Sequence, residues 1–192
     1  MLEGSRELPQ PTFSLQERLA AEHLVVSACF QCRKCSSGCP LTFAMDLLPD
    51  RVIRLALLGQ EEQVLGCNTI WVCSSCETCT TRCPNNIDIA GVMDWLKEEA
   101  LKRGKTIPQP EVAAFHRFFL DTVRSGGGRL GEARLMRRFT LYRLWRRFDL
   151  DELKETLRLG WKLRLKGRIR LLGPWALKGR KEIKQLFKEA KF

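Results

Sequence analysis

The stretch Cys29–Pro40 reads CFQCRKCSSGCP, and the stretch Cys73–Pro84 reads CSSCETCTTRCP. Both follow the pattern C-x2-C-x2-C-x3-C-P. In each copy, the first three cysteines are separated by two residues, so their thiolates can bind one group that offers several coordination sites. The fourth thiolate is turned away from that group. The proline after it has a fixed φ and no N–H, so it ends the cysteine loop and suits the first turn of a helix.

This doubled spacing indicates two 4Fe-4S clusters. In two-cluster ferredoxins the fourth cysteine of each motif ligates the cluster of the other motif. We therefore expect one cluster to be held by Cys29, Cys32, Cys35 and Cys83, and the other by Cys73, Cys76, Cys79 and Cys39. Shared ligation of this kind would make the two motifs fold as one unit.

Other uses of the cysteines fit the pattern less well. Zinc is held by two CxxC pairs and needs no third cysteine in register. A disulfide framework needs an oxidising compartment, and a redox dithiol needs only one pair. The ninth cysteine, Cys67, lies outside both motifs. We expect it to be a small packed side chain beside the second cluster, with a redox or ligand-exchange role as the minority interpretation.

Composition and charge divide the chain. Its 192 residues are 44% hydrophobic, which suffices for a core. The N-terminus MLEGSRELPQPTFS has no apolar region typical of export, and no later segment is apolar enough to span a membrane. We therefore expect a cytoplasmic protein. Residues 1–110 hold 11 Lys and Arg against 13 Asp and Glu, whereas residues 111–192 hold 22 against 9.

The sequence predicts an all-α fold, because no segment alternates long enough to make a convincing strand. Ser14 and Glu17 have the spacing of a capping box, and Asp88 can cap a helix that ends at Gly104. Expected helices are 15–28, 41–48, 51–58, 88–103, 112–123, 132–147, 151–166 and 181–190, with a short turn at 61–65. We expect three parts: a leader (1–14), a helical domain with two 4Fe-4S clusters (15–108), and a basic helical extension that docks on a partner (109–192).

The segments CFQCRKCSSGCP, NTIWVCSSCETCTTRCP and KGRKEIKQLFKEAKF resemble the C subunit of heterodisulfide reductase. The resemblance covers most of the chain from about Leu15 and implies an α-helical ferredoxin. It also implies two 4Fe-4S clusters that relay electrons from a flavin-containing A subunit to a disulfide-reducing B subunit, with the eight motif cysteines as ligands. Arg33 and Lys34 stand where small polar residues or glycine are expected, and two cations there should favour the reduced cluster.

The chain shows no sign of bond chemistry of its own. It lacks a CCG-type cysteine pair, a dinucleotide fingerprint and a nucleophile with its base, and its only histidines are His23 and His116. The sequence therefore predicts a non-catalytic electron-transfer subunit. One alternative is a peripheral membrane carrier whose segment LRLGWKLRLKGRIRLLGPW lies on anionic lipid. A nucleic-acid-binding regulator is the other, and it is disfavoured because no recognition pattern is present.

Overall fold

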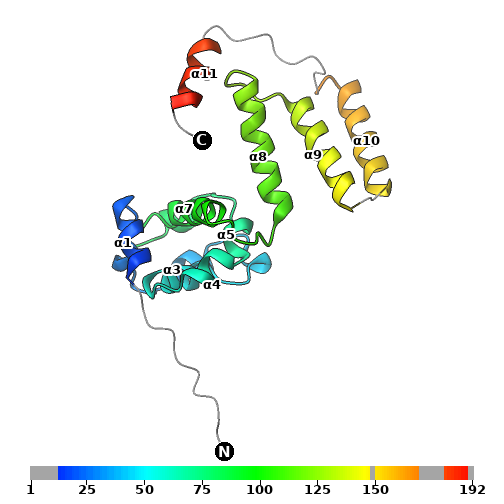
Figure 1. The fold of residues 1–192 in the computed structure, drawn as a ribbon. Helices are drawn as coiled ribbons and strands as arrows, with labels where there is room; N and C mark the ends of the chain where they lie inside the picture. Colours follow the sequence, from blue (N-terminus) through cyan, green and yellow to red (C-terminus); the bar gives the residue numbers. More distant parts are fainter. Residues whose placement is uncertain (1–12, 148–149, 169–179, 190–192) are drawn as a thin grey trace, which may run out of the picture. The chain divides into compact units, whose positions relative to one another are not determined.

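The computed structural model describes residues 13–147, 150–168 and 180–189. Regular secondary structure in these residues is helical, so the predicted all-α class is confirmed. The chain divides into two compact units, residues 1–109 and 110–192, which can be followed in Figure 1. Most of the predicted leader, together with Trp175 and Ala190 of the predicted extension, lies outside the described residues.

Unit 1 consists of short helices and two 3-10 turns around one longer helix, α7. These elements are α1 (Ser14–Ala21), η1 (Val26–Ala28), α2 (Lys34–Ser37), η2 (Thr42–Ala44), α3 (Pro49–Leu57), α4 (Glu61–Gly66), α5 (Thr69–Val72), α6 (Thr78–Thr81) and α7 (Ile89–Lys102). Helix α7 packs against α4, α5 and α6. Its buried side chains at helical spacing include Val92, Met93, Leu96 and Ala100.

Helix α7 begins and ends where the sequence predicted. Asp88 is its N-cap, and its carboxylate accepts a hydrogen bond from the Gly91 N–H at 2.9 Å. A Cβ atom on Gly91 would lie 2.4 Å from Asp88 Oδ2, so glycine leaves room for this cap. Gly104 follows the helix with φ of +61°, a conformation that glycine adopts without a steric penalty.

Three local predictions are wrong. Helix α1 ends at Ala21, because the chain turns at His23, whose φ is +62°. The capping box is absent: Phe13 is the N-cap, and the Ser14 hydroxyl donates to Glu61 Oε1 at 3.0 Å instead. The apolar run 41–48 forms only the 3-10 turn η2. In each case a contact with a distant residue or a turn replaces the local preference.

Unit 2 contains α8 (Pro110–Ser125), α9 (Glu132–Arg147), α10 (Leu150–Leu165) and α11 (Arg180–Glu189). The predicted helices 132–147 and 151–166 are confirmed, and the described part of 181–190 is helical. In Figure 1, α8, α9 and α10 lie side by side.

Helices α8 and α9 are joined by edge-on aromatic pairs, Phe115 with Phe139 at 5.3 Å and Phe118 with Tyr142 at 5.7 Å between ring centroids. Two other side chains of α8, those of His116 and Phe119, are exposed.

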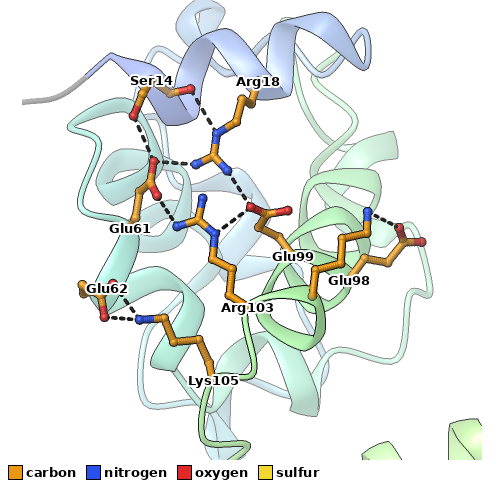
Figure 2. Close-up of polar contacts among 9 residues, drawn as sticks. Ser14, Arg18, Glu61, Glu62, Glu98, Glu99, Arg103 and Lys105 are labelled. Carbon is orange, nitrogen blue, oxygen red and sulfur yellow. Dashed lines mark hydrogen bonds and ion pairs between the residues drawn. The ribbon is translucent and has the colours of Figure 1, made fainter.

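An ion-pair network joins three helices of unit 1, as Figure 2 shows. Arg18 of α1 contacts Glu61 at 2.5 Å and Glu99 at 2.6 Å. Arg103, just after α7, contacts the same two carboxylates at 2.6 and 2.7 Å. Burial alone would raise the pKa of Glu61, but hydrogen bonds from Arg103, Arg18 and Ser14 outweigh it and lower the pKa. The network therefore stabilises the ionised carboxylate and with it the packing of α1 on α4 and α7.

Glu61→Gln should reduce the free energy of unfolding by about 1–3 kcal/mol, because it removes charge-assisted hydrogen bonds from a half-buried site. Anaerobic thermal unfolding of the cluster-loaded chain, followed by circular dichroism, measures this loss as a drop in Tm. A carboxylate with a lowered pKa gives its full stabilisation above its ordinary pKa, about 4.3, and loses it only below. The loss of stability should thus be constant from pH 6 to 9.

Glu62→Gln is the control, since this neighbour is 78% exposed and its substitution should change the free energy of unfolding by less than about 1 kcal/mol. An equal effect of both changes would contradict the prediction.

Candidate iron-sulfur site

The eight motif cysteines line two cavities in unit 1. These cavities, here called cavity 1 and cavity 2, are similar in size, and both are partly open to solvent. Cavity 1 is lined by Cys29, Cys32, Cys35 and Cys83, and cavity 2 by Cys39, Cys73, Cys76 and Cys79. Each cavity thus receives three cysteines of one motif and the fourth cysteine of the other. The structure brings together the same two groups that the sequence predicted as ligand sets.

The two cysteine loops have the same backbone conformation. Gln31 and Arg33 in the first loop have φ of 57° and 61°, and the equivalent Ser75 and Glu77 in the second have 52° and 59°. Such left-handed residues turn backbone N–H groups toward one side of the chain and form a concavity that favours negative charge. In the first loop the Gln31 N–H donates to Cys29 Sγ at 3.4 Å. These loops therefore direct donors at the sulfur atoms.

Each loop is followed by a one-turn helix that is fixed to the next long helix. After the first loop, Ser36 in α2 donates its hydroxyl to Asp50 Oδ1 at 2.5 Å and accepts from the Asp50 N–H at 3.0 Å. After the second loop, Thr80 in α6 donates to Asp88 Oδ1 and accepts from the Ala90 N–H, both at 3.1 Å. Ser36 and Thr80 occupy equivalent motif positions, so both loops are held by the same device.

The two motifs also hold each other. The Asn85 side-chain amide, just after the second motif, donates to the backbone carbonyl of Ala28, just before the first. Helices α2 and α6 pack together, and at their ends Arg82 lies over Gly38. A Cβ atom on Gly38 would come within 2.5 Å of Arg82 Cδ. Glycine at this position therefore leaves room for the Arg82 side chain.

The donor set of each cavity fits a thiolate-ligated cluster. Four thiols line each cavity, and soft thiolate ligands are those of iron-sulfur clusters. Among the residues that the structure describes, no group of three His, Cys, Asp or Glu side chains is arranged to hold a single metal ion.

Part of the chain matches a known protein family, and several known proteins are similar to it. Residues 25–87 match the family of the 4Fe-4S dicluster domain. The iron-sulfur C subunit of the CoB--CoM heterodisulfide reductase of Methanopyrus kandleri is 31% identical over 103 residues, which are 54% of this chain and 51% of that protein. A second relative is the C subunit of the ferredoxin/F(420)H(2)-dependent CoB-CoM heterodisulfide reductase of Methanosarcina acetivorans. It is 32% identical over 113 residues, 59% of this chain and 66% of that protein.

The chain is related to the C subunits of heterodisulfide reductase. The resemblance that the motifs indicated is thereby confirmed. The match to a C subunit of Methanothermobacter marburgensis is 32% identical over 80 residues, 42% of this chain and 43% of that protein. The chain thus spans about half the length of the first of these relatives. Helices long and apolar enough to cross a membrane are not found in the described ranges.

In this relative of the heterodisulfide reductase C subunits, the approach to the second loop depends on Asp46. Its carboxylate accepts hydrogen bonds from the backbone N–H groups of Asn68 and Thr69, at 2.8 and 2.9 Å, and from the Thr69 hydroxyl at 2.7 Å. Burial would raise the pKa of Asp46, but these hydrogen bonds outweigh it and lower the pKa. Helix α5, which begins at Thr69, is fixed in this way and leads directly into Cys73.

Burial acts on several of the cysteine thiols. It raises the pKa of Cys35 and Cys73, and raises that of Cys79 to about 11. Hydrogen bonds from Thr78 instead lower the pKa of Cys76, which is exposed. Thiols with a raised pKa hold their protons at neutral pH, so cluster binding has to displace protons from these positions.

Cys67 is buried, as predicted, and its thiol donates to the Val64 carbonyl at 3.1 Å. It lines neither cavity.

Two charged residues that position the loops were not predicted from the sequence. Asp46 acts on residues 22 and 23 positions away, and no local pattern indicates this. Lys97 does have a sequence signal, because it is a cation four residues after Met93 on the buried face of α7.

Glu77 lies between the second and third cysteines of the second motif and has a left-handed backbone conformation. Glu77→Gly should leave the stability unchanged or raise it by up to about 1 kcal/mol, whereas Glu77→Val should lower it by about 1–3 kcal/mol, since a β-branched residue is strained at φ of 59°. Thermal unfolding of the cluster-loaded variants ranks the two.

Exposed Glu98 inside α7 is the matched control for Glu77. At this ordinary helical position glycine is the less favourable of the two residues, so the order should reverse. The same order at both positions would rule out backbone strain as the cause.

Proposed function

We propose that this chain is an electron-transfer subunit of a heterodisulfide-reductase-like complex in the cytoplasm. The observation that carries the proposal is the pair of cavities, each lined by four cysteines drawn from both motifs, in a relative of the heterodisulfide reductase C subunits. Electrons would come from a flavin-containing A-type subunit and go to a B-type subunit that reduces a disulfide, as the resemblance implies. The chain itself would be non-catalytic.

Two 4Fe-4S clusters would be held by the cysteines of cavities 1 and 2. When bound, such clusters supply one-electron transfer. The chain contributes the sulfur ligands, the N–H donors directed at them and the packing that limits access of water. Cys32 and Cys76 are exposed, so that each cavity has an edge at the surface of unit 1 where a redox partner can approach.

We assign partner docking to the basic extension, residues 109–192, and cluster binding to residues 15–108. In α10, Leu157, Trp161 and Leu165 are spaced by four residues on one face and are 63%, 61% and 73% exposed. Exposed Arg158 and Lys162 flank this stripe. Apolar anchors at helical spacing beside cations fit an apolar groove with an acidic rim on a partner protein. Anionic lipid is the other surface that such a stripe would fit.

Anaerobic purification of the tagged full chain from its native cells, at moderate salt, tests the proposed function. We expect a flavoprotein and a protein with CCG motifs to accompany it, as identified by mass spectrometry. Recovery with nucleic acid or with membrane lipid alone would overturn the assignment in favour of one of the alternatives.

Replacing Leu157, Trp161 and Leu165 by serine should reduce partner recovery at least about tenfold, because the loss of several apolar anchors exceeds about 1.4 kcal/mol. The iron content should be unchanged, since the cysteines lie in unit 1. Exposed Glu155→Ser in the same helix is the control. Undiminished recovery of the partners by the triple variant would place docking elsewhere, and flotation with anionic vesicles shows whether the stripe binds lipid instead.

If the fourth cysteine of each motif ligates the cluster of the other motif, its substitution should affect that other cluster. Cys83→Ser should alter the EPR signal of the cluster whose other ligands are in the first motif, in the same way as Cys29→Ser. Cys39→Ser should reproduce the effect of Cys73→Ser. Cys67→Ser, at a position that lines neither cavity, should leave both signals and the iron content intact. If Cys83→Ser instead matched Cys73→Ser, each motif would hold its own cluster and the ligand assignment would be wrong.

A further inference from the structure

Lys97 places a buried positive charge against the second cysteine loop. Its side chain is 10% exposed. The ammonium group donates to the backbone carbonyl of Cys73 at 3.1 Å, to Ser75 Oγ at 3.4 Å and to Asp94 Oδ1 at 2.8 Å. A buried lysine is unusual unless it is paired, and two of its three acceptors belong to the loop that lines cavity 2.

Lys97, Asp94 and Ser75 are hydrogen-bonded to one another, which holds the lysine in place. The Ser75 hydroxyl donates to the same Asp94 oxygen at 2.7 Å that Lys97 contacts. Lys97 and Asp94 are one helical turn apart in α7, so the helix fixes both charges relative to the loop. The ammonium group contacts the backbone of Cys73, a residue that lines cavity 2, so the charge lies directly beside that site.

The corresponding buried charge at cavity 1 has the opposite sign. Asp50, which lines cavity 1, is 4% exposed. Arg33 approaches Asp50 only at 3.7 Å, and the arginine side chain is 73% exposed. Water and salt screen exposed charges far more than buried ones, so the buried charges, Asp50 at cavity 1 and Lys97 at cavity 2, decide the difference between the two sites.

Charge of this kind acts on the reduction equilibrium of a cluster. A 4Fe-4S cluster with four thiolates carries roughly −2 when oxidised, and taking up one electron makes it more negative by one unit without forming or breaking a covalent bond. A buried cation stabilises the more negative state, and a buried anion opposes it.

We propose that Lys97 is a positioning residue that raises the reduction potential of the cluster held by Cys39, Cys73, Cys76 and Cys79 above that of the other cluster. The second cavity is then the accepting end of the electron path through this subunit. This inference rests on the proposed function, because it needs both clusters to be present.

The test is an anaerobic redox titration of the reconstituted full-length chain, poised with dithionite and followed by EPR. Two 4Fe-4S signals in the unaltered chain are required first, and their absence would refute the proposed function itself. Lys97→Gln, which removes the charge and keeps a hydrogen-bond donor, should shift one cluster to lower potential. The expected shift is at least about tenfold in the reduction equilibrium, about 59 mV for one electron. The same cluster should respond to Cys73→Ser, and the other should keep its potential.

Two further variants separate charge from structure. Lys97→Arg keeps the charge and should retain the potential. Lys102→Gln removes an exposed charge from the same helix, since the side chain of Lys102 is 68% exposed, and should shift neither cluster.

Asp94→Asn leaves the positive charge of Lys97 without its neighbouring carboxylate charge and should shift the same cluster in the opposite direction, to higher potential. An unshifted potential in Lys97→Gln, or equal shifts of both clusters, would overturn the proposal. If Lys97→Gln fails to bind its cluster, Asp94→Asn decides alone: a rise supports the role of Lys97, and no rise refutes it.

Discussion

The constraint on which unit 1 depends is that Cys39 and Cys83 each have to reach the cavity of the other motif. Two loops that exchange a cysteine have to lie side by side, in a fixed register. The Arg82 side chain lies over Gly38, where no Cβ is present, and the Asn85 amide donates to the Ala28 carbonyl, which joins the end of the second motif to the start of the first. Each cavity is lined by four cysteines only because one of them comes from the other motif.

Helix α7 transmits this arrangement to the rest of unit 1. Its N-cap Asp88 is hydrogen-bonded to Thr80 of the second motif, its middle places Lys97 against the loop, and its C-terminal turn joins the network of Glu99 and Arg103. Through that network it also holds α1, which is otherwise a short helix of eight residues. One helix thus contacts the second motif at its start, places a buried charge against the loop from its middle, and joins the ion-pair network that holds α1 at its end.

The parts of the fold that follow local rules were predictable, and the parts that depend on distant partners were not. Cysteine spacing predicted the two groups that line the cavities, and Asp88 and Gly104 marked the ends of α7. The helix expected over 41–48 failed because Asp46 uses its carboxylate to hold the N–H groups of Asn68 and Thr69. The capping role expected of Ser14 failed because its hydroxyl bonds to Glu61, 47 residues later. No window of neighbouring residues contains either pair.

The charged side chains around the two cavities fall into an exposed group and a buried group. This difference suggests a role for Arg33, which stands where a small residue was expected. Arg33 occupies a left-handed position that glycine would fill at lower conformational cost. We therefore expect its exposed side chain to have a role at the surface. Arg33 and Lys34 give the rim of cavity 1 exposed positive charge, whereas Glu77 gives the rim of cavity 2 exposed negative charge. Under the proposed function, exposed rims of opposite sign attract different partners, and the buried Asp50 and Lys97 act on the clusters themselves. Under these proposals, charged side chains would serve recognition where water screens them and redox tuning where water is excluded.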